Sequence, residues 1–223
     1  MPPRSVMSVL PLLAVLAGCA SAPTGAPGSG PASPPSSAPA GPPSPASSAP
    51  ARPALPSLQE IQGRWWTWAA TEGEATSPLS DTTGERCARN QPDDLWFLAG
   101  TSGGLVRRTC VVPAGRPLVF PLVNRIADEP TCREFMATAQ GRAVLDGTAV
   151  PTRSLSDPDT IVTGTEDNAV TGEEGTYRVH GCGIWARLPP LPAGRHTLTI
   201  RGSSGDFKVG VDYTLVVEPG PSA

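Results

Sequence analysis

The chain has 223 residues, a formal net charge of −3 at pH 7, and aromatic side chains at only 5% of its positions. That length corresponds to about one folded domain once an export signal and a low-complexity segment are set aside. No basic patch with interleaved aromatic residues occurs in the sequence, so we expect no binding to nucleic acid.

The first 18 residues have the layout of an export signal. A single charge at Arg4 precedes an apolar run over residues 6–17, which is too short for a membrane-spanning helix of about 20 residues. The tetrad Leu16-Ala17-Gly18-Cys19 resembles the lipobox of bacterial lipoproteins. This resemblance implies cleavage before Cys19, acylation of its thiol and of the new N-terminus by lipids such as palmitate, and attachment to the extracytoplasmic face of a bacterial membrane. The alternative is cleavage after Ala20-Ser21-Ala22 and release of the protein.

Residues 19–56 comprise the lipidated Cys19 and a tether rich in proline, alanine and serine, with Arg52 as its only charge. Such a composition cannot build a core and is typical of a disordered linker. It would reach about 110 Å as extended polyproline and about 30 to 35 Å as a random coil. We therefore expect a folded domain over residues 57–219, held away from the membrane, and a short tail over residues 220–223.

The domain is expected to begin with a helix over residues 58–70. Ser57-Leu58-Gln59-Glu60 fits a capping box, and apolar residues then recur at helical spacing. Trp66 would point away from this apolar stripe. Two interpretations stay open for the tryptophans: a platform for sugar rings or a protein partner, or a helix that packs its aromatic rings against a sheet.

The middle of the chain predicts short strands, a second helix and a hairpin. Strands are expected over residues 95–100, 105–112 and 117–123, separated by glycine-rich and proline-containing turns. A second capping box in the segment Pro130-Thr131-Cys132-Arg133-Glu134 predicts a helix to about Gln140. Asp146-Gly147 between short apolar arms predicts a hairpin over residues 143–150. The polar and acidic residues 151–176 predict a long exposed loop.

The last third of the domain predicts three strands, over residues 184–188, 196–201 and 207–217. Apolar and polar side chains alternate along them, so one face of each strand should be buried. Short strands, frequent turns and only one or two short peripheral helices favour a mainly β fold, an antiparallel β-sandwich. The closing segments 191–200 and 213–217 are similar to the last hairpin of bacterial immunoglobulin-like domains, and this resemblance implies an immunoglobulin-like sandwich. Segments 65–69, 96–101 and 108–110 also resemble a family of uncharacterised secreted bacterial proteins, a resemblance that carries over no activity.

Four cysteines remain once Cys19 is assigned to lipid. An even number in an exported domain predicts two disulfides. Of the three possible connectivities we favour Cys87 with Cys110, which would bracket a hairpin, and Cys132 with Cys182, which would tie a helix to a late strand. A metal site is the alternative, but the sequence has no CxxC motif.

Candidate binding residues are Trp66 and the acidic side chains near expected loops, namely Asp128, Glu129, Asp157 and Asp159. Paired carboxylates are the machinery of glycoside hydrolysis, and oxygen-rich loops can hold Ca²⁺. The common hydrolase motifs and an EF-hand pattern are absent from the sequence. We therefore expect a monomeric binding or envelope module without cofactor or metal, whose partner is a cell-wall glycan or an envelope protein. The alternative is a carbohydrate-active hydrolase that uses the loop carboxylates.

Overall fold

The computed structural model describes residues 56–220. The expected signal peptide, the acylation site at Cys19 and nearly all of the tether lie outside these residues. Within the described range, no helix has the length and the apolar character needed to cross a membrane.

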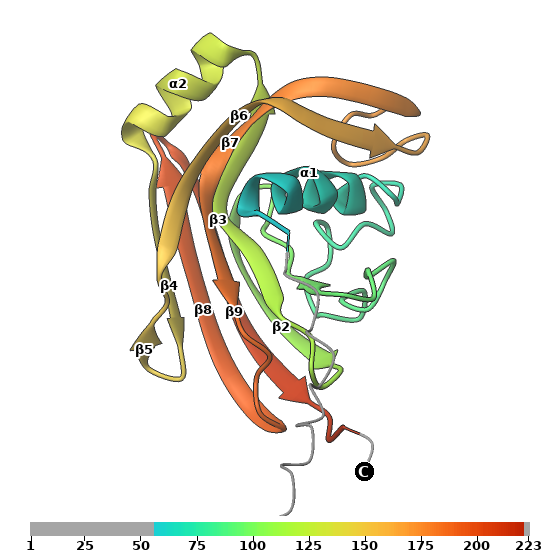
Figure 1. Ribbon diagram of the computed structural model, residues 1–223, viewed down its shortest axis with the longest axis vertical. Coiled ribbons are helices and arrows are strands. Elements are labelled where there is room, and N and C mark those ends of the chain that lie inside the picture. The colour runs from blue at the N-terminus through green and yellow to red at the C-terminus, as the bar shows by residue number, and fades with distance from the viewer. Residues whose placement is uncertain (1–55, 221–223) are drawn as a thin grey trace, which may run out of the picture. The chain divides into compact units, whose positions relative to one another are not determined.

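The described domain is mainly β, with two sheets and two helices (Figure 1). The four-stranded sheet has the order β1 (Trp96–Phe97), β3 (Leu118–Ala127), β7 (Gly175–Leu188), β6 (Thr152–Gly164). The five-stranded sheet has the order β2 (Gly104–Val112), β9 (Phe207–Val217), β8 (Gly194–Ser204), β4 (Gln140–Leu145), β5 (Thr148–Ala149). A strand occurs within each segment where the sequence predicts one, but β1 has only two residues of the expected 95–100, and β3, β7 and β8 are longer than expected.

The expectation of a wholly antiparallel arrangement is wrong at two places. β1 runs parallel to β3, and β2 runs parallel to β9, whereas the other pairs of neighbouring strands in the described domain are antiparallel. The hairpin expected between Cys87 and Cys110 therefore does not form, because β1 and β2, which follow each other in the chain, enter different sheets. A local sequence pattern selects strands but cannot select their partners.

The larger apolar core lies between the two sheets. One face of β3 contributes Leu118, Phe120 and Leu122, and the facing strands β8 and β9 contribute side chains such as Ile200 and Leu215, all nearly inaccessible to solvent. The alternation of buried and partly exposed residues along β9 is the one that its sequence predicts. Burial of these side chains on two facing sheets holds the domain together.

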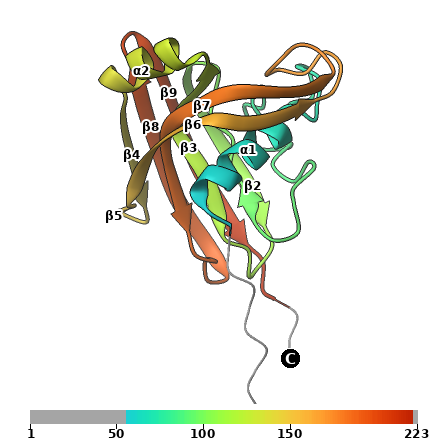
Figure 2. The same ribbon diagram turned by 45° about the horizontal axis from the view of Figure 1, so that its top comes forward.

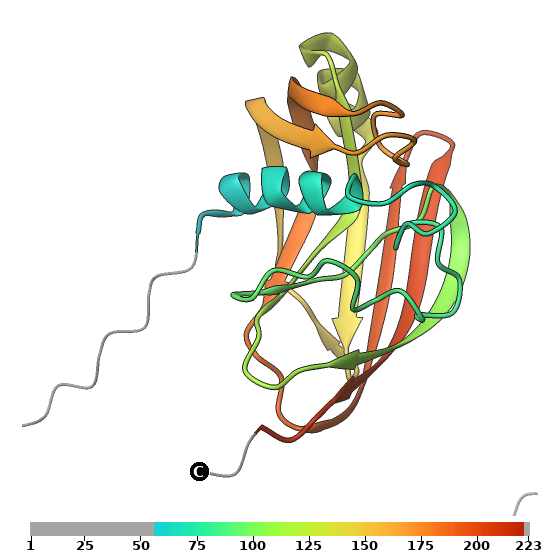
Figure 3. The ribbon, with the colours of Figure 1, turned by 90° about the vertical axis from the view of Figure 1, so that its right-hand side faces the viewer.

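A second apolar core lies on the opposite face of the four-stranded sheet, beneath α1 (Leu58–Ala69) (Figure 3). Trp65 of α1 packs edge to face on Trp185 of β7 at 5.5 Å between ring centroids, and the Trp65 indole nitrogen donates to Leu98 O at 3.0 Å. The helix begins with the expected capping box, in which Ser57 and Glu60 satisfy each other's main-chain nitrogen atoms. The four-stranded sheet is thus covered on both faces.

The second helix, α2 (Glu129–Thr138), starts earlier than the sequence suggested. Asp128 is its N-cap and accepts a hydrogen bond from Thr131 N at 2.9 Å, so the capping box expected at Thr131 and Glu134 is wrong. Pro130 sits in the first turn, where its missing N–H costs nothing. The expected hairpin after this helix is confirmed as β4 and β5, with Asp146 and Gly147 at positive φ in the turn.

Both expected disulfides are present. Cys87 bonds to Cys110 of β2, and Cys132 of α2 bonds to Cys182 of β7. The second bond ties a helix to a late strand, as predicted, although the first joins an irregular segment to β2 instead of bracketing a hairpin. Disulfides persist in oxidising compartments, which indicates an extracytoplasmic domain.

The expectation of a loop over residues 151–176 is wrong, because most of this segment is the strand β6. Its side chains are polar because β6 is an edge strand with one exposed face, and a bulge between Asp157 and Thr160 interrupts its pairing with β7. Only residues 165–174 form a loop. The amide of Asn168 organises this loop by donating to Thr165 O and accepting from Thr171 N at 2.7 and 2.8 Å.

Candidate functional site

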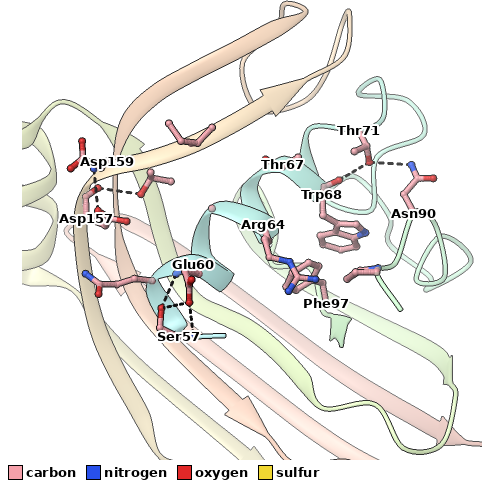
Figure 4. Close-up of a pocket in the computed structure, with 15 residues that line it drawn as sticks. Ser57, Glu60, Arg64, Thr67, Trp68, Thr71, Asn90, Phe97, Asp157 and Asp159 are labelled. Carbon is pink, nitrogen blue, oxygen red and sulfur yellow. Dashed lines mark hydrogen bonds between the residues drawn. The ribbon is translucent and has the colours of Figure 1, made fainter. Parts of the chain in front are cut away.

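A groove of about 710 Å³ lies between the exposed side of α1 and the strand β6 (Figure 4). We call it the α1/β6 groove. Its lining comes from α1, from the bulged part of β6 and from the segment that precedes β1. The lining residues are Ser57, Gln59, Glu60, Gly63, Arg64, Thr67, Trp68, Thr71, Asn90, Pro92, Phe97, Asp157, Asp159, Thr160 and Ile161.

The groove exists because α1 lies against the open edge of β6. Thr67 Oγ1 accepts a hydrogen bond from Thr163 N at 3.1 Å, and Ala70 O accepts one from Thr165 N at 3.0 Å. A side chain at Gly63 would place its Cβ 3.2 Å from Ile161 O, so glycine allows the helix to approach the strand this closely. α1 thereby covers the main-chain groups that an edge strand would otherwise leave open.

One end of the groove is acidic. The Glu60 carboxylate accepts hydrogen bonds from the hydroxyl and the main-chain N–H of Ser57 at 2.8 and 2.7 Å, and these bonds lower its pKa. On the bulge, Asp157 Oδ1 accepts a hydrogen bond from Asp159 N at 3.1 Å, while Asp159 pairs with Arg178 at 2.7 Å. Each carboxylate therefore has a partner within the protein, yet all three line the groove.

The other end of the groove is held by an ion pair. Arg64 of α1 donates two parallel hydrogen bonds to Asp94, one of them at 2.8 Å, and this pairing raises the pKa of Arg64 and lowers that of Asp94. The floor here is formed by the edges of Trp68 and Phe97, which are otherwise buried. The exposed apolar side chain of the groove is Ile161, at 42% of its maximal exposure.

Of the acidic residues singled out from the sequence, Asp157 and Asp159 reach the groove, and Asp128 and Glu129 do not. Asp128 caps α2, and its pKa is lowered by hydrogen bonds from Thr131. Glu129 pairs with Arg133 one turn along the same helix at 3.0 Å. The two sets of carboxylates do not form a shared site.

The expectation that Trp66 points away from the buried stripe is wrong. Its side chain retains 8% of its maximal exposure and packs edge to face on Trp65 at 5.0 Å between ring centroids. The sheet and the segments that flank α1 bury more of the helix than its own periodicity predicts. Trp66 therefore offers no exposed aromatic platform, and the interpretation of the tryptophans as packing residues is the one that the structure supports.

No group of three or more metal-ligating side chains occurs within residues 56–220. Glu166 and Asp167 belong to the loop that Asn168 organises, and Asp157 and Asp159 take part in the contacts given above. The described residues thus show no preformed calcium site.

Nothing in the sequence indicated two contacts that histidine side chains make in the structure. Ser156 Oγ lies 2.7 Å from His180 Nε2, but the buried His180 Nδ1 has no partner among the described residues, and neither residue lines the groove. The pair lacks the orienting acid of a catalytic triad. His196 Nδ1 lies 2.7 Å from Asp146, which also accepts from Thr197 N, so this contact ties β8 to the β4–β5 turn.

The buried cation Arg108 was also missed, since a charged residue in the middle of β2 gives no sign of burial in the sequence. Its guanidinium donates to four main-chain carbonyls and to the Tyr213 hydroxyl, at distances from 2.6 to 3.2 Å. The carbonyls belong to Leu79, Asp81, Ala99 and Gly100. This network fixes the irregular segment on one side of the groove floor and is structural.

Comparison with known proteins assigns no family. No protein-family model matches the chain, and no curated protein is significantly similar to it.

Proposed function

We propose that the protein is a lipid-anchored extracytoplasmic binding module, attached through Cys19, which uses the α1/β6 groove to hold an extended, positively charged segment of an envelope protein. The observation that carries this proposal is the groove itself: it is open, has a polar rim and an exposed apolar contact at Ile161, and is lined by three carboxylates against one guanidinium. That guanidinium, on Arg64, is paired with Asp94, and Asp159 is paired with Arg178, so among residues 56–220 the carboxylates of Glu60 and Asp157 have no ionic partner. The surplus negative charge favours a cationic ligand.

A polypeptide fits this lining better than a cell-wall glycan does. Sugar rings are commonly held by stacking on exposed aromatic faces, and the two rings in the groove, Trp68 and Phe97, are each 4% exposed or less. Alternating lysine and apolar side chains on an extended segment could instead meet the carboxylates and Ile161 in turn. The binding experiment therefore includes a glycan, so that binding of a sugar can be told apart from binding of a peptide.

The binding test uses the full chain, purified in mild detergent, with three probes: a hexapeptide of alternating lysine and leucine, the matching glutamate peptide, and a chito-oligosaccharide. We expect the lysine peptide to bind and the other two not to. Asp157→Asn together with Asp159→Asn should weaken binding about fivefold, because the exposed ion pair to Asp157 contributes roughly 0.2–1 kcal/mol and loss of Asp159 leaves the positive charge of Arg178 without its partner. Glu166→Gln, outside the groove, is the matched control. Binding of the sugar alone, or an unchanged affinity in the double variant, would refute the assignment.

The anchor is tested separately. Cys19→Ala removes the thiol that the lipobox resemblance assigns to the lipid, so the variant should leave the membrane fraction. Mass spectrometry of the mature N-terminus should find an acylated cysteine in the unmodified protein. A variant that stays membrane-bound, or a mature chain that begins downstream of Cys19, contradicts lipid anchoring.

For the fold we propose an immunoglobulin-like β-sandwich. Two facing sheets with a shared apolar core and a last hairpin formed by β8 and β9 support it. An experimental structure in which the strand order of the two sheets differs from the order described above would contradict this relation.

A carbohydrate-active hydrolase is the second candidate, favoured by the three carboxylates that line one groove. A glycosidase needs a carboxylic acid whose pKa is raised so that it stays protonated, whereas the pKa of Glu60 is lowered by its bonds to Ser57. New reducing ends after incubation with chito-oligosaccharides or peptidoglycan, abolished by Asp157→Asn, would favour this candidate over the binding module.

A further inference from the structure

A second hollow is lined in part by α2, a helix that lies apart from α1 on the domain (Figure 2). It has a volume of about 660 Å³ and is lined by residues of α2, of β3 and of the β8–β9 turn. An adjoining hollow of about 240 Å³ shares Asn124, Arg125 and Phe207 with it. We call the two together the α2-end cleft. None of the residues that line the 660 Å³ part lines the α1/β6 groove.

Two polar side chains in the cleft have hydrogen-bonding or charge capacity that the protein leaves unused. The Asn124 side chain makes no hydrogen bond to another described residue, and its buried Nδ2 donor is unpartnered. Arg125 beside it is exposed and has no carboxylate within 4.0 Å in residues 56–220. Arg125 is therefore the group that a ligand in the cleft can reach, since the Asn124 Nδ2 atom is buried.

The opposite charge lies on the α2 wall of the cleft. Glu134 lines the same hollow as Arg125 but makes no ion pair with it, so the two charges are more than 4.0 Å apart. The neighbouring Arg133 is taken up by Glu129. The cleft therefore presents to a single ligand a cation and an anion that make no close ion pair within residues 56–220, while the charge of Arg125 also helps to lower the pKa of Asp128.

The rest of the cleft combines the side chains of Phe135 and Phe207 with hydroxyl groups, and its walls are fixed by bonds within the protein. Phe207 keeps 39% of its maximal exposure and lines the same hollow as Arg125. Ser204 Oγ donates to Phe135 O at 2.8 Å and lies 3.1 Å from Thr138 Oγ1, so the β8–β9 turn is bonded to α2. The disulfide between Cys132 and Cys182 holds α2 to the sheet. A wall that is already fixed in place loses little entropy on binding.

We propose that the α2-end cleft binds a short peptide as a zwitterion. The peptide carboxylate accepts hydrogen bonds from Arg125, its ammonium group lies at Glu134, and an apolar side chain covers Phe207. The volume of the cleft lies in the range of 300–1,000 Å³ that is usual for small-molecule sites and accommodates a dipeptide.

The experiment uses calorimetric titration of the full chain in mild detergent with leucyl-leucine, its C-terminal amide and its N-acetyl form. We expect leucyl-leucine to bind, and the amide to bind about tenfold more weakly because it lacks the charge-assisted bonds to Arg125. Arg125→Gln should weaken binding of leucyl-leucine about tenfold, while Arg195→Gln, on an exposed position of β8 outside the cleft, should not change it.

Glu134→Gln provides a more specific test. It should weaken binding of leucyl-leucine about threefold and leave binding of the N-acetyl form unchanged, because only the free ammonium group meets the carboxylate. Each variant is compared with the unmodified protein in urea unfolding, so that loss of folding is recognised. No heat of binding at millimolar leucyl-leucine, equal affinity for the amide, or an unchanged affinity in Arg125→Gln overturns the proposal. Because the groove and the cleft share none of the residues substituted, the two proposals fail independently.

Discussion

Replacement of Arg108 by methionine tests whether this buried cation organises the domain. Only 2% of the Arg108 side chain is exposed, and its guanidinium makes five hydrogen bonds, one of them to the Tyr213 hydroxyl. Burial raises the pKa of Tyr213, so this hydroxyl is neutral and can accept the hydrogen bond from Arg108 while it donates to Ala99 O at 2.7 Å. Methionine fills a similar length but donates nothing.

Two opposing terms set the size of the effect. Each hydrogen bond from a charged donor contributes roughly 1.5–3 kcal/mol, and carbonyls left without a partner add about 1–3 kcal/mol each. Against this, removing the buried charge recovers a desolvation cost of several kcal/mol. Tyr213 keeps its bond to Ala99 O, so one carbonyl stays satisfied. We expect Arg108→Met to lower the free energy of unfolding by about 3–5 kcal/mol.

Urea unfolding followed by tryptophan fluorescence measures this change, since all five tryptophans lie in the domain and are buried. Arg107→Met is the matched control: the neighbouring arginine on β2 has a side chain 84% exposed and only a 3.9 Å contact with Asp212. That variant should change stability by less than about 0.5 kcal/mol. A loss below about 1 kcal/mol in Arg108→Met, or equal losses in both variants, would show that the irregular segment does not depend on this network.

Three further predictions concern cross-links, titration and close packing. Substituting both Cys132 and Cys182 by serine should lower the free energy of unfolding by about 4 kcal/mol in urea, because the loop closed by this bond spans 50 residues. The pKa of His196 is raised by its bond to Asp146, so the protonated form is favoured in the folded state. Its contribution to stability is therefore full below pH 6.5 and is lost as pH rises through the folded-state pKa, and His196→Gln should flatten the pH dependence of the urea midpoint in that range. In Gly202→Ala, the new Cβ would clash with the main-chain carbonyl oxygen of Leu122 on β3, which should cost about 1–3 kcal/mol or more in thermal and urea unfolding.

Each of these predictions has its own control. Removing the Cys87–Cys110 bond, which spans 23 residues, should cost less, about 3 kcal/mol, and the reverse order would contradict the chain-entropy reasoning. A pH profile identical in His196→Gln and in the unmodified protein would show that the Asp146 contact does not favour the charged imidazole. In Gly147→Ala the new Cβ meets no atom within 4 Å, so this variant is the comparison for Gly202→Ala. Any loss of stability in Gly147→Ala should come only from the positive φ of this residue.

Local order in this protein follows from the sequence. The capping box at Ser57 starts α1, the Asp146-Gly147 turn makes a hairpin, and alternating apolar residues mark β9, because each signal involves groups only a few residues apart. The even number of cysteines beyond the signal also indicated two disulfides. Two of the fifteen residues that line the groove, Asp157 and Asp159, were singled out from the sequence as acidic residues, although their place on a strand was not foreseen.

Tertiary structure alone decided which strands pair, which faces are covered and where the hollows lie. The sequence predicts a loop over most of β6 because an edge strand with a polar outer face lacks the alternating pattern of a buried strand. Only the pairing with β7 and the contacts with α1 hold this segment as a strand. Trp66 and Arg108 are buried by segments far away in the chain, which their neighbours in sequence cannot reveal. The α1/β6 groove and the α2-end cleft likewise arise between elements that are distant in sequence. Long-range packing places these groups together, and a local pattern contains no information about that packing.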